Sequence, residues 1–320
     1  MNDFLIRKYT DVKESFTLLT KIKYYAFIRF CLRLLANTIL PIWFMISRKT
    51  SKKQTLLSSE KDESVIVSLT TFPARISRIW IVIECMLRQT VKPNRIILWL
   101  SKDQFPSEEF LPKRLLNLKE SGLEIILCDD DLRSHKKYYY SLQNFPEDLI
   151  ITIDDDLLYP SFLIEDLLKL HEKFPETIVC CRGLKINDSD EVIKYNNLDY
   201  LYNGDGPNNN VFFTTGGGTL FTKNNFVGEV LNKNVFMENC KYADDVWLNL
   251  MAQFNNTEVV KSNNHFESIP IYNFRDIKLS SVNVDNGLND KQLHDVIEYY
   301  NGTYTIKNRK KFIILNFSKL

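Results

Sequence analysis

From residue 64 to residue 181, short apolar runs typical of buried strands alternate with segments whose apolar residues recur at helical spacing. Strands are expected at residues 65–69, 95–100, 123–128, 149–153 and 178–181. Helices are expected between them, at residues 76–88, 107–119, 136–143 and 162–172. This alternation predicts an α/β fold in which helices flank a mostly parallel, doubly wound, Rossmann-like sheet.

The alternation ends at Arg182. Residues 183–213 are rich in Asn, Asp, Tyr and Gly and are expected to form a long excursion from the sheet. Later elements are expected as helices at residues 224–231, 242–254 and 291–300 and as strands ending near residues 221, 261 and 317. The pattern predicts three parts, which are an N-terminal arm at residues 1–60, a central α/β domain at residues 61–275 and a C-terminal extension at residues 276–320 that packs on that domain.

Three consecutive aspartates, Asp154, Asp155 and Asp156, directly follow the apolar run at residues 149–153. In open parallel sheets, ligands collect beyond the carboxyl ends of the strands. Carboxylates crowded there repel one another unless a cation holds them. Asp154 and Asp156 are expected to point to the same side of the chain and predict a divalent metal site. The alternative is a turn before a helix that Pro160 opens.

Charge is distributed unevenly along the chain, although its net value is only +1. Residues 1–53 carry eleven Lys or Arg and three Asp or Glu, a net charge of +8, which leaves −7 on the remainder. A nearly neutral chain is not expected to bind nucleic acid. Within the basic arm, residues 22–46 are rich in apolar and aromatic side chains, but Arg29 and Arg33 interrupt them and Pro41 is expected to break any single helix.

The basic arm is expected to lie on a membrane as an amphipathic helix, because a central arginine costs about 2.5–3.5 kcal/mol on insertion scales for a spanning helix. Its apolar side would enter the acyl boundary while its cations meet anionic head groups. These cations are Lys21, Lys23, Arg29, Arg33, Arg48, Lys49, Lys52 and Lys53. The alternative is an ordinary helix packed on the protein. The six cysteines form no CxxC pair and mostly lie in apolar runs, which suits reduced core residues in a cytosolic protein. With the basic arm, this predicts a cytoplasmic protein that is peripheral at the inner face of the membrane.

The order of several motifs resembles glycosyltransferases of the GT-A fold, most closely the family 2-like group that uses nucleotide-sugar donors. The resemblance spans roughly residues 64–267. It is carried by Val67-Ser68-Leu69-Thr70-Thr71-Phe72-Pro73-Ala74-Arg75, Leu87-Arg88-Gln89-Thr90, the acidic triplet, Gly216-Gly217-Gly218 and Ala243-Asp244-Asp245. It implies that the central domain is a metal-dependent transferase. The enzyme would move a sugar from a nucleotide-diphosphate donor to a cell-surface glycan or lipid-linked acceptor, and the first candidate donor is a UDP-sugar.

By position, the resemblance assigns donor and metal contacts. It places the donor against Thr70, Thr71, Pro73, Arg75 and Asp155. Asp154 and Asp156 would form the DxD pair that holds Mn²⁺ or Mg²⁺ on the donor diphosphate, where the cation neutralises the leaving group. Family members commonly end the second strand with an acidic pair and a serine. This chain instead has Trp99-Leu100-Ser101-Lys102-Asp103, so the resemblance leaves the nucleotide base open.

The resemblance also implies the catalytic residues. Asp245, with Asp244 beside it, would be the general base that deprotonates an acceptor hydroxyl for inverting displacement at the anomeric carbon. Capping of the helix at residues 246–251 is the alternative for this pair. His265 lies where some GT-A enzymes place a third metal ligand, although a loop histidine is more often structural.

Further donor contacts are expected from Asp129, Lys136, Lys137, Gly217 and Gly218. Either lysine could steady the diphosphate, or both could lie on a solvated helix face. The glycines could let main chain approach the sugar closely, or they could form a tight turn. Asp129 could accept a hydrogen bond from the ribose or base, or it could be a turn residue.

Two other functions share parts of this pattern. A sugar-phosphate nucleotidyltransferase would use the same sheet, metal and phosphate chemistry, but such enzymes usually carry a glycine-rich basic loop after the first strand. The corresponding Phe72-Pro73-Ala74-Arg75 contains no glycine. A non-catalytic membrane-bound protein could use the aspartates only to bind a cation.

Overall fold

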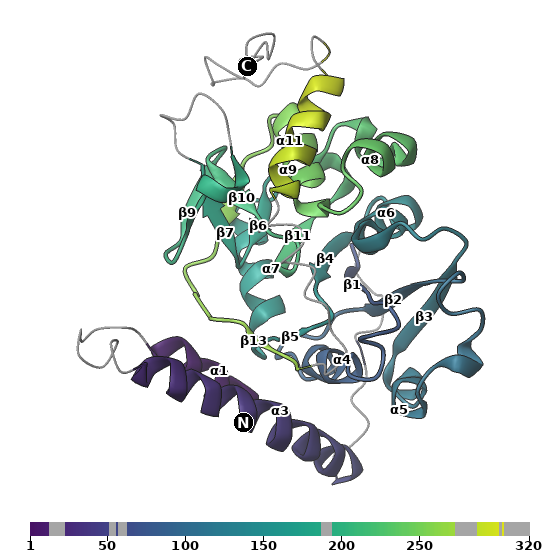
Figure 1. The fold of residues 1–320 in the computed structure, drawn as a ribbon, viewed down its shortest axis with the longest axis vertical. Coiled ribbons are helices and arrows are strands. Elements are labelled where there is room, and N and C mark those ends of the chain that lie inside the picture. The colour runs from purple at the N-terminus through teal and green to yellow at the C-terminus, as the bar shows by residue number, and fades with distance from the viewer. Residues whose placement is uncertain are drawn as a thin grey trace.

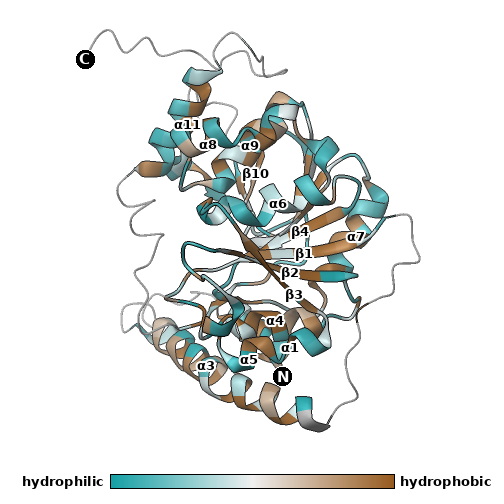
Figure 2. Ribbon diagram, turned by 90° about the vertical axis from the view of Figure 1, so that its right-hand side faces the viewer, coloured by the Kyte–Doolittle hydropathy of each residue, from teal (hydrophilic) through white to brown (hydrophobic). Residues whose placement is uncertain are grey.

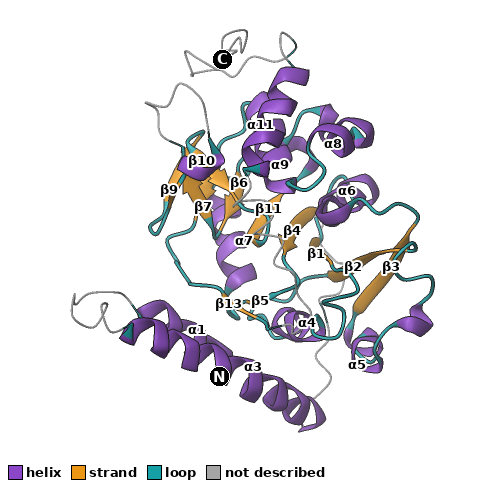
Figure 3. Ribbon diagram, viewed as in Figure 1, coloured by secondary structure: helices purple, strands orange, loops and turns teal. Residues whose placement is uncertain are grey.

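The computed structural model describes residues 1–12, 23–50, 56, 63–186, 194–272, 287–300 and 303. Its centre is an eight-stranded sheet with helices against both faces (Figures 1 and 3). The strand order is β3-β2-β1-β4-β11-β6-β12-β9. These strands are β1 (Val65–Thr70), β2 (Arg95–Ser101), β3 (Leu123–Cys128), β4 (Leu149–Ile153), β6 (Ile178–Cys180), β9 (Asp205–Asn208), β11 (Gly217–Phe221) and β12 (Val259–Lys261).

The sheet is mostly parallel, as the sequence predicts. β3, β2, β1 and β4 pair in parallel, and so do β6 and β12. β11 lies between β4 and β6 and runs antiparallel to both, while β9 closes one edge antiparallel to β12. The five strands predicted before residue 182 are all present and their bounds agree within one residue. The α/β prediction is therefore confirmed.

Alternate residues of the central strands face opposite layers of helices. Val67 and Ile151 belong to one half of the core, and their neighbours Ile66 and Ile150 belong to the other. The first half is covered by α1 (Asn2–Asp11), α3 (Tyr24–Thr50), α4 (Trp80–Leu87) and α7 (Leu163–Lys173), and the second by α6 (Lys136–Asn144) and α9 (Asp244–Phe254). Figure 2 shows the hydrophobic strands between these layers. Because both faces are covered, polar sites are left to the ends of the strands.

Three helical segments are shorter than predicted. Tight turns precede α4, with hydrogen bonds from Arg75 N to Phe72 O and from Arg78 N to Arg75 O, each of 3.0 Å. The segment at residues 107–119 breaks at Pro112 because proline holds the preceding residue extended. It forms 3₁₀ turns at Glu108–Phe110 and Lys119–Ser121 and the short α5 (Lys113–Leu116). Residues 224–231 likewise form two 3₁₀ turns, at Lys223–Asn225 and Gly228–Leu231.

The excursion after β6 contains regular structure. β7 (Gly183–Lys185) pairs antiparallel with both β8 (Asp199–Tyr200) and β10 (Val211–Phe213) to form a small second sheet. A further pair joins β5 (Leu157–Leu158) to β13 (Ile269–Pro270). Along the chain, the excursion thus adds a separate small sheet between β6 and β11.

α3 is one continuous helix, so the expectation that Pro41 breaks it is wrong. A proline within a helix leaves the carbonyl four residues earlier without its usual hydrogen bond. Here that carbonyl belongs to Asn37, and Arg78 Nη2 donates to it at 3.2 Å. Asn37 Nδ2 also donates to the Pro270 carbonyl at 2.9 Å, and Asn37 Oδ1 accepts from the Tyr272 amide at 2.7 Å. Contacts with the central domain therefore replace the bond that the proline removes.

The arginines of α3 face the protein. Arg29 and Arg33 lie over the ring of Tyr9 in α1, at 5.5 and 5.3 Å from its centroid, and Arg33 Nε donates to the Tyr9 hydroxyl at 2.6 Å. Arg48 pairs with Glu84 at 3.1 Å. The expectation that these three arginines meet lipid head groups is therefore wrong. Lys21, Lys52, Lys53 and the side chain of Lys49 lie outside the described part of the chain.

The opposite side of α3 is apolar and exposed. With the start of the chain it presents a set that we call the arm face, formed by Met1, Phe4, Tyr24, Phe27, Phe30, Leu34, Leu35, Ile39, Ile42 and Ile46. Those in α3 mostly recur every three or four residues and so share one side of the helix. By length and composition, Tyr24–Arg48 could cross a membrane, a criterion that core helices and signal sequences also meet. Figure 1 shows α1 and α3 together, at the opposite end of the molecule from α11.

The C-terminal helix α11 (Leu288–Tyr299) agrees with the helix predicted at residues 291–300. It packs beside α8 (Lys233–Asn239) and α9. At its end, the Tyr300 ring lies 6.3 Å from that of Trp247 and 5.6 Å from that of Phe254. The strand predicted near residue 317 lies outside the described residues.

Candidate active site

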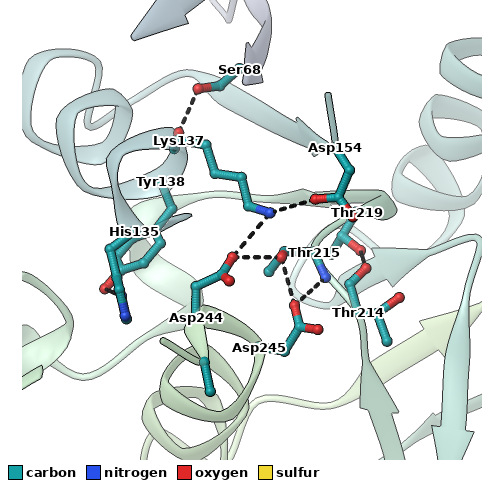
Figure 4. Close-up of polar contacts among 12 residues, drawn as sticks. Ser68, His135, Lys137, Tyr138, Asp154, Thr214, Thr215, Thr219, Asp244 and Asp245 are labelled. Carbon is teal, nitrogen blue, oxygen red and sulfur yellow. Dashed lines mark hydrogen bonds and ion pairs between the residues drawn. The ribbon is translucent and has the colours of Figure 1, made fainter. Parts of the chain in front are cut away.

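Asp154 of the acidic triplet and the Asp244–Asp245 pair come together although about 90 residues separate them in the sequence (Figure 4). Asp154 follows β4 at its carboxyl end, and Asp244 and Asp245 begin α9. Lys137, in the first turn of α6, lies between the two groups. Its Nζ is 3.0 Å from Asp154 Oδ1 and 3.1 Å from Asp244 Oδ2. A buried ammonium therefore joins the strand end to the helix start.

Lys137 is held in its charged form by these carboxylates. Its side chain is 4% exposed, and burial alone would lower its pKa. The charges of Asp154, Asp244 and Asp245 outweigh burial, so the pKa of Lys137 lies above its ordinary value. The lysine is a fixed positive charge at any physiological pH.

The two aspartates of α9 have opposite pKa shifts. Burial raises both, but Lys137 and His135 outweigh it at Asp244, whose pKa falls below its ordinary value. At Asp245, burial and then the charge of Asp244 raise the pKa. Thr215 contacts both, because its hydroxyl lies 2.7 Å from Asp244 Oδ2 and 2.6 Å from Asp245 Oδ1, and its amide donates to Asp245 Oδ1 at 2.8 Å. A carboxylate whose pKa is raised toward neutrality is suited to accept a proton.

Asp155 points away from Lys137 and into the turn that follows β1. It accepts hydrogen bonds from the Thr71 hydroxyl and from Arg75 Nη1, the latter at 2.7 Å. Arg75 Nη1 is also 2.9 Å from Asp156 Oδ2. Burial raises the pKa of Asp155, and the Arg75 charge opposes that shift. Arg75 therefore ties the triplet to the β1 turn, which is the segment expected to hold the nucleotide.

The glycine run packs against the site. An added Cβ on Gly216 would meet Asp154 Oδ2 at 1.7 Å, and one on Gly217 would meet Arg182 Cβ at 2.4 Å. Gly218 has a φ of +93°, a conformation that favours glycine. The Tyr159 hydroxyl lies 2.5 Å from the Gly216 carbonyl and accepts from the Asp154 amide at 2.7 Å. Gly216 thus lets main chain lie against the Asp154 carboxylate, and Gly217 lets it lie against Arg182.

The other residues predicted to contact the donor have different surroundings in the structure. Thr70 donates from its hydroxyl to the Trp99 carbonyl at 2.8 Å. Asp129 is exposed and pairs with Lys102 at 2.5 Å. Lys136 is buried and pairs with Asp131 at 2.6 Å, so of the two predicted lysines it is Lys137 that faces the triplet. Pro73 is exposed in the turn after β1.

His265 lies in a cluster of aromatic side chains. Its ring is 5.7 Å from that of Tyr200 and 5.3 Å from that of Tyr202, and Nε2 is 3.5 Å from a Glu267 oxygen. Its Nδ1 is buried and makes no hydrogen bond with the described residues. Its role as a metal ligand stays a prediction.

The described residues fit a cation that is shared with substrate. Among them, no three His, Cys, Asp or Glu side chains are grouped to hold a metal. Mg²⁺ and Mn²⁺ sites in nucleotide enzymes often need only one or two carboxylates, because phosphate and water supply the remaining oxygens. Asp154 and Asp156 are 35% and 29% exposed, and both follow β4. They can reach such a cation from the protein side.

Sequence reasoning missed two residues at this site. Thr215 contacts both aspartates predicted to be catalytic, and its only signal is a hydroxyl next to the glycine run. Arg182 ends the run after β6, where a charged residue looks like an ordinary strand terminator. Its pKa is raised because Asp154 and Asp245 outweigh its burial, which places the guanidinium within range of both charges.

Comparison with known proteins gives no family. No protein-family model matches the chain, and no curated protein matches it. Solved structures similar to it are the 1–349 fragment of S. aureus TarS in complex with UDP-GlcNAc, at 9% identity and a TM-score of 0.44, and the same fragment with UDP, also at 9% and 0.44. Mannosyltransferase PcManGT from Pyrobaculum calidifontis, in complex with GDP-Man and Mn²⁺, is similar at 11% and 0.41.

These similarities differ in extent. The match to TarS with UDP-GlcNAc covers 63% of this chain and 57% of that one, so this chain spans less than two thirds of TarS 1–349. The match with UDP covers 63% and 59%, and the match to PcManGT covers 85% and 86%. The chain is thus similar in structure to TarS bound to UDP-GlcNAc or UDP and to a mannosyltransferase bound to GDP-Man, at identities and scores too low to assign it an activity.

Proposed function

We propose that this protein is a metal-dependent glycosyltransferase that moves a sugar from a nucleotide-diphosphate donor to a glycan or lipid-linked acceptor. The observation that carries the proposal is the bridge that Lys137 forms between Asp154 and Asp244. It brings the carboxylates predicted for the donor and those predicted for the base into one cluster, at the edge of the sheet where ligands collect.

The donor would lie along the β1 turn and the triplet. Thr71 and Arg75 would shape the nucleotide site through Asp155, and Asp154 with Asp156 would face the diphosphate. When bound to these carboxylates, Mg²⁺ or Mn²⁺ would neutralise the charge that develops on the leaving diphosphate. Thr70, Pro73, Asp129, Lys136, Gly217, Gly218 and His265 keep their predicted donor or metal roles as part of this proposal.

Asp245 would be the general base. Oδ1 is fixed by Thr215, whereas Oδ2 makes no hydrogen bond with the described residues and can accept the proton of an acceptor hydroxyl. Direct attack by that hydroxyl would invert the anomeric configuration. Asp244, paired with Lys137, would stay ionised and hold the pKa of Asp245 up.

The decisive measurement is the product released from a panel of UDP- and GDP-sugars incubated with the full chain and Mn²⁺. A glycosyltransferase releases nucleoside diphosphate, and the variant with both Asp154→Asn and Asp156→Asn should release far less. Release of pyrophosphate from sugar phosphate and nucleoside triphosphate would instead identify a nucleotidyltransferase. If neither product forms with any donor, the proposed activity is refuted.

The arm face would hold the enzyme on the cytoplasmic surface of the membrane. With Arg29, Arg33 and Arg48 turned toward the protein, the outer side of α3 carries large apolar residues, and burying one such side chain contributes about 1.5–3 kcal/mol. The bonds from Asn37 to Pro270 and Tyr272 keep the other side of α3 on the protein, which favours a helix lying on the membrane over one that spans it.

Flotation with anionic lipid vesicles tests this part. The substitutions Phe30→Gln, Ile39→Gln and Ile42→Gln together should abolish co-flotation without unfolding the protein, because all three side chains are exposed. Phe110→Gln is the matched control, since Phe110 is 70% exposed and lies far from the arm in sequence. Equal flotation of the triple variant and the control would exclude the arm face as a membrane anchor.

A further inference from the structure

Residues 214, 215 and 216 each touch a different charged group of the site. The Thr214 hydroxyl accepts from Arg182 Nε at 2.9 Å. Thr215 binds Asp245, and the main chain of Gly216 lies against the Asp154 carboxylate. Arg182, Asp245 and Asp154 are therefore arranged around one short segment, just before β11.

The position of Arg182 is fixed by its surroundings. Its carbonyl accepts from the Thr214 amide at 3.1 Å, and the Thr214 hydroxyl holds Nε on the same side. Gly217 packs so closely that a Cβ there would meet Arg182 Cβ at 2.4 Å. Tyr195 and Tyr200 of the excursion lie near enough to act on its charge. Little freedom is left to this side chain.

The terminal nitrogens of Arg182 make no hydrogen bond or ion pair with the described residues. The neighbouring cations differ, because Lys137 pairs with Asp154 and Asp244, and Arg75 pairs with Asp155 and Asp156. A guanidinium that is partly buried, fixed at Nε and unpaired at its two amino groups presents the planar fork that binds phosphate in two places. Neither amino group is among the fully buried unpaired atoms of the described residues, so both are open to a ligand.

We propose that Arg182 binds a phosphate group of a substrate, between Asp154 and Asp245. This rests on the proposed glycosyltransferase function and adds a substrate contact to it. The nearby carboxylates would repel an approaching phosphate, and Arg182 supplies the positive charge that draws it in. The phosphate can come from the diphosphate of the donor or from a phosphorylated acceptor.

Isothermal titration with the full chain in Mn²⁺ separates the two sources. The probes are UDP, GDP and, at saturating UDP, glycerol 3-phosphate. Arg182→Gln should weaken one of them by at least about tenfold, as expected for lost charged hydrogen bonds. Weaker UDP or GDP binding assigns the phosphate to the donor, and weaker glycerol 3-phosphate binding alone assigns it to the acceptor.

Two further variants keep the test decisive. Arg182→Lys retains the charge without the fork and should bind with intermediate affinity, even if Arg182→Gln does not fold. Arg95→Gln is the matched control at the other end of the strands, where Arg95 pairs with Glu124. If Arg182 variants bind all three probes as the wild type does, the proposal is overturned. A wild type that binds neither UDP nor GDP contradicts the proposed function, and glycerol 3-phosphate then decides the role of Arg182 by itself.

Discussion

Replacing Lys137 by methionine should cost the protein a large share of its stability. The substitution keeps the length of the side chain and removes the ammonium between Asp154 and Asp244. Asp154 is 35% exposed, so water would compensate most of its loss, and that pair contributes at most about 1 kcal/mol. Asp244 is 10% exposed and would be left as an unpaired buried charge, which costs about 3–5 kcal/mol. The second effect decides the result.

Urea unfolding at pH 7 measures this free energy. We expect Lys137→Met to lose about 3–5 kcal/mol, and the double variant with Asp244→Asn to recover much of it, because no unpaired charge remains. Lys102→Met is the control, since Lys102 is 52% exposed and solvent screens its pair with Asp129. A Lys137→Met protein as stable as the Lys102→Met protein would refute the reasoning.

The same variant has a predictable pH dependence. The pKa of Lys137 is raised in the folded protein, so its contribution to stability is fully present below the unfolded value, near about 10.4, and is lost only above that. The pKa of Asp244 is lowered, so its contribution is present above about 3.9 and is lost as pH falls through the lower folded value. The stability deficit of Lys137→Met should therefore be greatest at mildly alkaline pH and shrink as pH falls, because burial raises the pKa of Asp244 once Lys137 is gone and the unpaired carboxyl then protonates in the variant.

Further substitutions test the base, the glycine contact and the helix around the proline. Transfer activity should fall as pH drops through the raised pKa of Asp245, because a protonated base cannot accept the acceptor proton, and Asp245→Asn should lose this limb together with most of the turnover while still binding donor. Gly216→Ala should displace the Asp154 carboxylate and lower Mn²⁺-dependent donor binding, with little change in melting temperature. Arg78→Met should destabilise the protein by roughly 1–3 kcal/mol in urea, because the Asn37 carbonyl loses its donor.

The parallel strands could be predicted because each is a local signal. The five residues before Asp154, four of them apolar and the other Thr152, form a typical buried strand. The direction of β11 could not be predicted in this way. The glycines before it indicate close approach or a turn, whereas its antiparallel place between β4 and β6 depends on partners more than 35 residues away.

The same distinction applies to the candidate site: residues with a local sequence signal could be predicted, and residues that depend on distant partners could not. Asp154, Asp156 and Asp245 stand out because several acidic residues adjoin a strand end or a helix start. Arg182 does not stand out, because its partner Thr214 is 32 residues away and nothing near it in the sequence points to a ligand. The direction of Lys137 was likewise open, since two adjacent lysines at a helix start can both be solvated.

The arm shows why composition alone misjudged the arginines. In the sequence, Arg29 and Arg33 interrupt the apolar residues of this helix. In the structure, both side chains lie on the ring of Tyr9 in α1, so the opposite side of α3 remains apolar. The fixed side of α3 is bonded through Asn37 to residues 270 and 272, and this strand follows directly from the loop that carries His265. In the same stretch, the Glu267 amide donates to the Thr10 hydroxyl of α1 at 2.9 Å. One short segment bonds to both N-terminal helices and borders the aromatic cluster around His265, so the arm face and the carboxylates proposed as catalytic hold a fixed orientation. A membrane bound at the arm face would therefore determine from which side an acceptor reaches those carboxylates.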